Sequence, residues 1–565
     1  MSDDRMSRLR AGQGEIANHV IDEFTAGRLT RRDFIRRGTV AGLSLPLLGA
    51  IVSACGSPSP SSSSSPATGS GSGAGKAGAT IRAGLYTPSG AINPVTVDDI
   101  GGLALLGQCG EYLCVSQQDL TLKPALATKW SANSKADVWT FDIRQGVKFH
   151  DGTPLTADDV VYTYKLHTNP KGSANALSAF GGVLLPDGVV KKDDHTVEFH
   201  LTAPTGSFPY LTSSDNYNMV IMPNNYDPTK WQSSFIGTGP FKLVSYQPKQ
   251  GATFTRNGSY WGPKALPAGT QFTFYDDQTP MILALTSGSI DTLQQFAVSG
   301  GEQLLSGGYN VIKLKSSAHR ELSMRCDKPP FNDPRVRQAL ALTLDRSAIV
   351  KALFKGYSDL GNDSPFAPVY PSTSTSVAQR AQNIAKARSL MSAAGHAGGF
   401  TVDLYTLQLQ EVPQFAQIVA QAAAQIGIKI KLHVQSTSAY YGKATFGNSN
   451  WLDGTMSLVN YGHRSVPDVF LNAPLETYSA SKGTGSWNAA HFANPQYDKL
   501  VGQYTASIDV SSQKSLAGQI EQLLLDQTPI VFAYFYNYLA ASATDTHGVY
   551  PTAISHLFLD KATKG

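Results

Sequence analysis

The sequence predicts an α/β protein with two or three domains. Helical patterns alternate with short apolar strands across residues 333–538, which is typical of α/β domains. The chain has 565 residues and is therefore too long for a single hydrophobic core. Hydrophobic residues make up 41% of the chain and aromatic residues 10%, which is ample for globular folding.

Most elements expected before residue 320 are strands. The folded region begins near Ala79 with the alternating strand TIRAGLY, and residues 103–113 have helical apolar spacing. Residues 138–149 alternate and end in the turn signal HDG. Thr156 is expected to cap a helix with acidic residues in its first turn. Further strands are expected at 197–201, 241–246, 252–255 and 271–275.

Helices become frequent beyond residue 320. Asp333 is expected to cap a helix over 333–355, with Pro334 at its first position. Further helices are predicted at 384–394, 413–427 and 513–527, and strands at 401–406, 428–434 and 530–538.

The segment from Thr30 to Cys55 has the order of an export signal. Arg31 and Arg32 lie in TRRDFIR, which resembles the twin-arginine motif of the bacterial folded-protein export route. An apolar run follows and ends in VSAC, which resembles the lipobox that precedes a lipid-modified cysteine. A spanning helix needs about 20 predominantly apolar residues, whereas this run is shorter and contains Pro46. We therefore expect residues 1–54 to be a twin-arginine lipoprotein signal peptide rather than a membrane anchor or a buried helix.

Residues 55–78 are rich in serine, glycine and proline and are expected to form a flexible tether. The hexapeptide GAGKAG within it matches GxGxxG. No strand precedes it, so a dinucleotide site is not expected.

Charge and cysteine content narrow the function classes. The formal net charge is +4, and the arginines of the signal alone exceed it, so no basic patch indicates nucleic-acid binding. Besides Cys55 the chain has Cys109, Cys114 and Cys326. The first two could pair, but all three are interpreted as small buried side chains. No Cys/His cluster has zinc spacing, so no metal site or cofactor is expected.

Motifs of one family recur in order from about residue 80 to the end of the chain. They include VKFHDGTPLTADDV at 147–160, GTGPF at 237–241 with RN at 256–257 and YW at 260–261, SGSID at 287–291 and PFNDPRVRQAL at 330–340. Together these segments resemble the solute-binding lipoproteins of peptide and nickel type that serve ABC importers, known as solute-binding family 5.

The resemblance implies a two-lobed, periplasmic-binding-protein-like fold of type II that closes on its ligand by a hinge motion. An extra subdomain is inserted in the first lobe. The expected domains are lobe one at 79–110, 235–318 and 536–565, the inserted subdomain at 111–234, and lobe two at 319–535.

The resemblance also implies an extracytoplasmic receptor that is not an enzyme. It would capture an oligopeptide, a dipeptide or a similar small solute and deliver it to membrane permease subunits with cytoplasmic ATPases. The protein is expected to act as a monomer, either periplasmic or anchored to the outer face of the cell membrane by lipid at Cys55.

The family's ligand loop in lobe two corresponds to residues 457–468. Peptide receptors of the family usually carry an aspartate there that pairs with the peptide ammonium, and His463 occupies this position. His463 and Arg464 would favour a neutral or anionic ligand group, because arginine offers a planar fork for carboxylate or phosphate. The alternative is that Arg464 points to solvent and His463 bonds backbone. Tyr461 would form an aromatic wall or pack in the core, and Asn460 beside it is a further candidate.

In lobe one, Asp98 or Asp99 precedes the first helix near the family's acidic or backbone contacts, and a helix cap is the alternative. Three aromatic residues could line the pocket, although such residues more often pack in the core: Tyr440, Tyr441 and Trp451.

Other types of ligand, and one other class of protein, are alternatives. The ligand could be a non-peptide anionic or neutral molecule, or a nickel or other metal chelate held by His319, His433 and His491 if folding brings them together. A secreted hydrolase is less favoured because the chain lacks a GxSxG elbow and an HExxH motif. His150 and Asp151 are adjacent but are interpreted as a turn.

Overall fold

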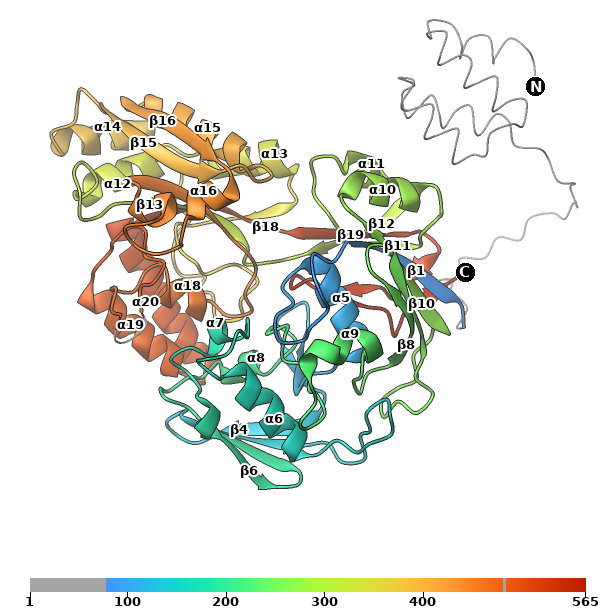
Figure 1. Ribbon diagram of the computed structural model, residues 1–565. Helices are drawn as coiled ribbons and strands as arrows, with labels where there is room; N and C mark the ends of the chain where they lie inside the picture. The colour runs from blue at the N-terminus through green and yellow to red at the C-terminus, as the bar shows by residue number, and fades with distance from the viewer. Residues whose placement is uncertain (1–77, 481–483) are drawn as a thin grey trace, which may run out of the picture. The chain divides into compact units, whose positions relative to one another are not determined.

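The computed structural model describes residues 78–480 and 484–565 (Figure 1). The expected signal peptide and nearly all of the tether, with Arg31, Arg32 and Cys55, lie outside the described residues. In the described part, no helix is long and apolar enough to cross a membrane. Three sheets of seven, six and four strands organise this part of the chain.

The seven-stranded sheet has the order β12-β19-β11-β1-β10-β9-β8. Its middle strand, β1 (Thr80–Tyr86), is parallel to β10 and β11, and the other pairs are antiparallel. Ile81, Ala83 and Leu85 of β1 are fully buried, as the alternating pattern predicts. The other elements are α5 (Ile100–Cys109), β8 (Phe241–Gln247), β9 (Gly251–Arg256), β10 (Gly269–Tyr275), α10 (Gln278–Thr286), β11 (Thr292–Phe296), α11 (Glu302–Leu305), β12 (Tyr309–Leu314) and β19 (Tyr538–Ala543).

The six-stranded sheet has the order β14-β18-β13-β17-β15-β16, and β15 runs parallel to both of its neighbours. Its strands are β13 (His319–Met324), β14 (Ser358–Leu360), β15 (Phe400–Leu407), β16 (Ile428–Gln435), β17 (Met456–Tyr461) and β18 (Ile530–Tyr536). Its helices are α12 (Pro334–Ala341), α13 (Arg346–Phe354), α14 (Ile384–Ala393), α15 (Val412–Ala424), α16 (Thr437–Tyr441), α17 (Asn450–Asp453), α18 (Asp468–Asn472), α19 (Pro495–Ala506) and α20 (Val510–Gln527).

The four-stranded sheet is antiparallel, with the order β4-β5-β7-β6. Helix α6 (Ala157–His167) packs on it and begins with a capping box between Thr156 and Asp159. Aromatic side chains fill the space between sheet and helix, as in the contact of Tyr164 with Phe199. The strands and helices of this region are β2 (Cys114–Ser116), β3 (Leu122–Pro124), β4 (Ala127–Ala132), β5 (Val138–Ile143), α7 (Leu177–Phe180), β6 (Val189–Asp193), β7 (Thr196–His200), α8 (Phe208–Leu211) and α9 (Trp231–Ser234).

The chain passes twice between the two larger sheets, from β12 to β13 and from β18 to β19 (Figure 1). The single strand predicted over 530–538 is therefore wrong, because Asn537 separates two strands that pair in different sheets. The side chain of Asn537 accepts a hydrogen bond from the Ser316 backbone N–H at 3.2 Å, so it ties the second crossing to the first. Two short adjacent connections between two sheets are what a hinge between lobes requires.

Two predicted helices differ in extent. The helix expected over 333–355 is two helices, α12 and α13, because Asp345 accepts a hydrogen bond from the Ala348 N–H at 2.9 Å and caps a new helix. The helix expected over 103–113 ends at Cys109, where Gly110 is already extended. Cys109 and Cys114 are both buried and unpaired.

Glu111 binds two segments that carry the family motifs. Its carboxylate accepts hydrogen bonds from Tyr260 Oη at 2.6 Å, from Trp261 Nε1 at 2.7 Å and from Thr238 Oγ1 at 2.7 Å. Burial raises the pKa of Glu111 to about 7 although these donors oppose the shift. The GTGPF and YW motifs thus have a structural role, which is to hold the start of the 111–234 segment.

Glu111→Gln is expected to reduce the pH dependence of stability. A carboxyl group whose pKa is raised on folding contributes stability below pH 4.5 that is lost as the pH rises through about 7. Glutamine keeps a neutral side chain and removes that loss. The drop in unfolding free energy between pH 5 and pH 8, measured by urea denaturation, should shrink by about 2 kcal/mol. An unchanged drop would contradict this account.

Candidate functional site

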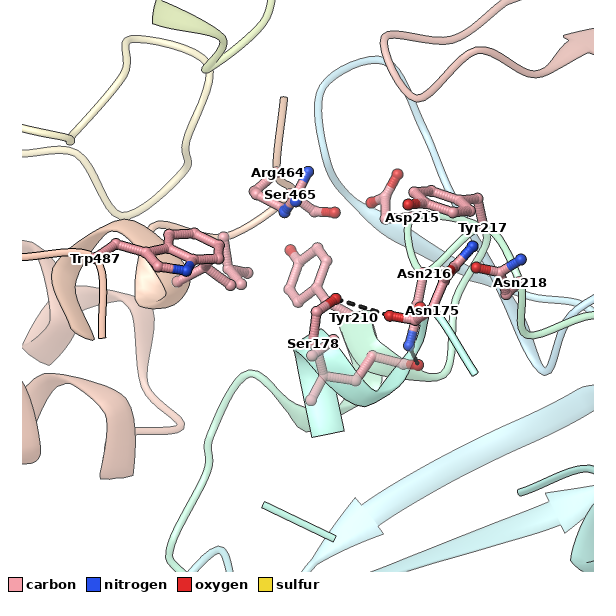
Figure 2. A pocket seen from close by; sticks show the side chains of 14 residues that line it. Asn175, Ser178, Tyr210, Asp215, Asn216, Tyr217, Asn218, Arg464, Ser465 and Trp487 are labelled. Carbon is pink, nitrogen blue, oxygen red and sulfur yellow. Dashed lines mark hydrogen bonds between the residues drawn. The ribbon is translucent and has the colours of Figure 1, made fainter. Parts of the chain in front are cut away.

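Two neighbouring cavities lie where the loop after β17 approaches the 111–234 segment. The small cavity, of about 50 Å³, is lined by Tyr210, Asp215, Tyr217, Arg464 and Trp487 among others (Figure 2). The large cavity, of about 380 Å³, is lined by residues 116–120, Asp215, residues 313–315, Pro368, Val369, His463, Thr552 and Ala553. Asp215 lines both cavities, so the two form one candidate site.

The segment before α8 closes onto the six-stranded-sheet region beside this site. The Gly206 N–H donates to the Thr505 carbonyl at 2.7 Å, and Ser207 Oγ donates to the Asp468 carboxylate. A Cβ at Gly206 would lie only 2.0 Å from the Ser507 carbonyl oxygen, so this approach requires glycine. Burial raises the pKa of Asp468 to about 6.

His463 is buried and is held as a neutral hydrogen-bond donor. Its Nδ1 lies 3.0 Å from the Ser317 backbone N, whose N–H can only donate, so we assign the ring proton to Nε2. Burial and the adjacent Arg464 lower the pKa of His463 to about 3. Its Nε2–H can therefore donate to a ligand oxygen, but the ring has no free lone pair for an ammonium.

Arg464 is fixed through its backbone, and its guanidinium has no acidic partner. Its N–H donates to Ser317 Oγ at 2.9 Å, and its carbonyl accepts from Ser317 Oγ at 2.7 Å and from Tyr370 Oη at 2.9 Å. The guanidinium donates to the His463 carbonyl at 2.9 Å. Within residues 78–480 and 484–565, no carboxylate forms an ion pair with it, so its charge is available to an anionic ligand group.

Asp215 is the charged group of this site that the sequence analysis missed. Its Oδ2 is buried and has no hydrogen-bond partner among the described residues. Burial raises the pKa of Asp215 to about 6, and the nearby hydroxyls of Ser116 and Ser465 oppose the shift. It lies in the polar loop SSDNYN, which carries no motif, so only the fold could bring it to the site.

Asn460 and Tyr461 do not line either cavity. Asn460 Oδ1 accepts from the buried Arg320 guanidinium and from Tyr536 Oη at 3.1 Å. Tyr461 is 7% exposed and packs against His319 and Trp487 in the core of the six-stranded-sheet region. The two side chains do not reach a cavity because β17 is an interior strand of the sheet and is covered on both faces. Their part in ligand binding stays a prediction.

Asp98 and Asp99 differ in role. Asp99 caps α5 by accepting from the Gly102 N–H at 2.7 Å, whereas Asp98 is exposed and lines neither cavity. A contact between Asp98 and the ligand therefore also stays a prediction. Tyr440, Tyr441 and Trp451 belong to the core of the six-stranded-sheet region and line neither cavity.

The three histidines considered for a metal lie apart. His319 is fully buried among aromatic rings, His433 pairs with Asp403 at 2.7 Å, and His491 lies 3.7 Å from Asp327. In the described ranges, no group of three or more His, Cys, Asp or Glu side chains could hold a metal ion.

Comparison with known proteins identifies the family. The model for bacterial extracellular solute-binding proteins, family 5, matches residues 121–479, which is more than half of the chain. The chain belongs to this family. It is thus an extracytoplasmic solute-binding receptor of an ABC importer, which captures a small ligand between two lobes.

Named relatives and solved structures agree with this assignment. The dipeptide-binding protein DppE of Bacillus subtilis is 25% identical over 478 residues, covering 78% of this chain and 84% of the relative. The periplasmic murein peptide-binding protein MppA of Escherichia coli is 27% identical over 478 residues, covering 79% and 86%. The structure of HbpA2 from Haemophilus parasuis matches with a TM-score of 0.76 and 21% identity, covering 86% of this chain and 100% of that chain. The expected two-lobed α/β fold is confirmed.

Proposed function

We propose that this receptor binds a short peptide or a peptide-like solute in the two cavities beside residues 462–466. The observation that carries the proposal is the wall around His463 and Arg464, which offers a neutral donor and an unpaired cation beside apolar Pro368 and Val369. Carbonyl and carboxylate oxygens of a peptide suit such donors. The large cavity is within the range of about 300–1,000 Å³ typical of small-ligand sites, and relatives are named for binding a dipeptide and a murein peptide.

A thermal-shift screen tests the ligand class. Residues 78–565 are incubated with mixtures of dipeptides, of tripeptides and of small carboxylic acids. A peptide ligand should raise the melting temperature in proportion to the logarithm of its concentration and be recovered unchanged. Shifts with carboxylic acids alone, or cleavage of the peptide, would contradict the peptide proposal.

A non-peptide anion is the second candidate, because Arg464 has no acidic partner and Lys313 and Lys315 border the large cavity. This candidate predicts equal binding of a carboxylic acid with and without an amino group. A receptor for peptides would bind the amino-containing ligand more tightly.

We infer that the lobes close on the ligand about the two crossings near Ser316 and Asn537. These are the connections between the two larger sheets, and the cavities lie between groups supplied from both sides of them. A ligand that contacts both sides stabilises the closed arrangement because it binds that arrangement better.

We propose that lipid at Cys55 anchors the receptor to the outer face of the cell membrane after twin-arginine export. The support is the order of Arg31, Arg32, an apolar run and VSAC in the sequence. A tether then keeps the receptor near its permease at a high effective concentration.

Cys55→Ala is expected to move the protein from the membrane fraction to the soluble extracytoplasmic fraction. Lysine at both Arg31 and Arg32 should instead leave the protein in the cytoplasm. Cell fractionation followed by immunoblotting measures both, with Cys326→Ala as the control that leaves the distribution unchanged. A Cys55→Ala protein that stays with the membrane would contradict lipid anchoring.

A further inference from the structure

Asp215 presents a carboxylate whose Oδ2 is buried and has no counter-charge, at the point where the two cavities meet. Its Oδ2 has no hydrogen-bond partner in the described part of the chain, and no cation forms an ion pair with it there. Leaving a charged oxygen unpaired in a buried place is costly, because its lost hydration is not replaced. A donor of positive charge that reaches this oxygen in the working state of the protein would remove that cost.

The other charged and polar groups of the site are hydrogen-bond donors or cations. His463 offers only an N–H, since its Nδ1 is occupied by the Ser317 backbone N–H. Arg464 offers a guanidinium from the far side of the small cavity, and Figure 2 shows Arg464 and Ser465 across from Asp215 and Tyr217. The loop after β17 is therefore suited to ligand oxygens and unsuited to an ammonium.

We propose that Asp215, supplied by the 111–234 segment, binds the ammonium group of the ligand, and that the loop carrying His463 and Arg464 binds ligand carbonyl or carboxylate oxygens. The ligand class is thus a solute with a free primary amine and an oxygen acceptor a few bonds away, such as a peptide with an unmodified N-terminus. This inference rests on the proposed peptide function and fixes which end of the ligand meets which side of the cavity.

Neighbouring charges support this direction of binding. Asp119 also borders the large cavity, but its carboxylate already accepts from the Thr121 N–H at 3.0 Å and from Thr121 Oγ1 at 2.7 Å. Asp215 lines both cavities, and its Oδ2 lacks a hydrogen-bond partner although the hydroxyls of Ser116 and Ser465 lie near the carboxylate. The remaining basic side chains that line the cavities repel an ammonium or donate hydrogen bonds: Lys313, Lys315, His463 and Arg464. Tyr210 and Tyr217, which line the small cavity, are neutral because burial raises the pKa of each phenol.

The test compares free and blocked amines on wild-type and variant receptors. Isothermal titration uses one mixture of tripeptides and the same mixture after N-acetylation. The wild-type chain should bind the free peptides at least about 30-fold more tightly, since an unpaired buried charge is left when the amine is blocked. Asp215→Asn should weaken binding of the free peptides by a similar factor and leave the acetylated mixture unchanged. The matched control Asp187→Asn, an exposed aspartate of the same segment that lines neither cavity, should bind as wild type does.

The outcomes separate this inference from the function on which it rests. Equal wild-type affinity for free and acetylated peptides, or unchanged binding by a folded Asp215→Asn protein, overturns the role of Asp215 and leaves a peptide receptor. No binding of either mixture by the wild-type chain overturns the peptide proposal and this inference with it. Melting curves of each ligand-free variant establish that it is folded, and the acetylation comparison needs no variant.

Discussion

Asp363→Asn is expected to lower the free energy of unfolding by about 3 kcal/mol or more. Asp363 is fully buried, and its two oxygens accept from the Arg346 guanidinium at 2.7 and 2.8 Å. Arg380 lies 2.9 Å from the same carboxylate, and the Phe532 N–H donates to it at 3.1 Å. The amide has the same shape but no charge, so it leaves two largely buried guanidinium groups without their counter-ion.

Asp158→Asn provides the control for this prediction. Asp158 forms an ion pair with Lys191 at 2.8 Å, but half of its side chain is exposed. Such pairs contribute about 1 kcal/mol or less. The urea denaturation midpoint of Asp363→Asn, read by circular dichroism, should therefore lie clearly below that of Asp158→Asn. Equal midpoints would contradict the importance of the buried cluster of Asp363, Arg346 and Arg380.

Arg464→Ala is expected to weaken binding of the peptide ligand by about 2 kcal/mol, or about 30-fold. The backbone of Arg464 is held by Ser317 and Tyr370, so the substitution removes the guanidinium without releasing the loop. Isothermal titration of wild type and variant with the same peptide measures the loss.

Arg388→Ala is the matched control, because Arg388 is exposed on α14 and lines neither cavity. Its affinity should equal that of wild type. If Arg464→Ala also binds as wild type does, the guanidinium points away from the ligand. The proposed contact between Arg464 and a ligand carbonyl or carboxylate oxygen would then be wrong.

The positions of most helices and strands were predictable from the sequence. The points at which one predicted helix or strand is divided into two were not. Alternation placed β1 correctly, and the capping residues Thr156 and Asp333 mark true helix starts. Asp345 and Asn537 were harder to read. Asp345 caps a new helix through the nearby Ala348 N–H inside a continuous apolar pattern. Asn537 divides a strand and binds the Ser316 N–H, a partner that the tertiary fold brings to it. Periodicity within one segment carries no information on such partners.

The candidate site was predictable only where it lies in a motif-bearing loop. His463 and Arg464 follow a strand and precede a short helix, and both line a cavity. Asp215 comes from a loop that folding brings to the same place from more than two hundred residues away in sequence. Tyr461 illustrates the reverse case, because an aromatic residue beside a ligand loop has the same sequence signature in a cavity wall as in a core.

The most direct test of the account is an isothermal titration of residues 78–565 with a tripeptide chosen from the thermal-shift screen. Saturable binding of one peptide per chain is expected, with the peptide recovered intact. Absence of saturable heat for any peptide, or release of cleavage products during the titration, would contradict it.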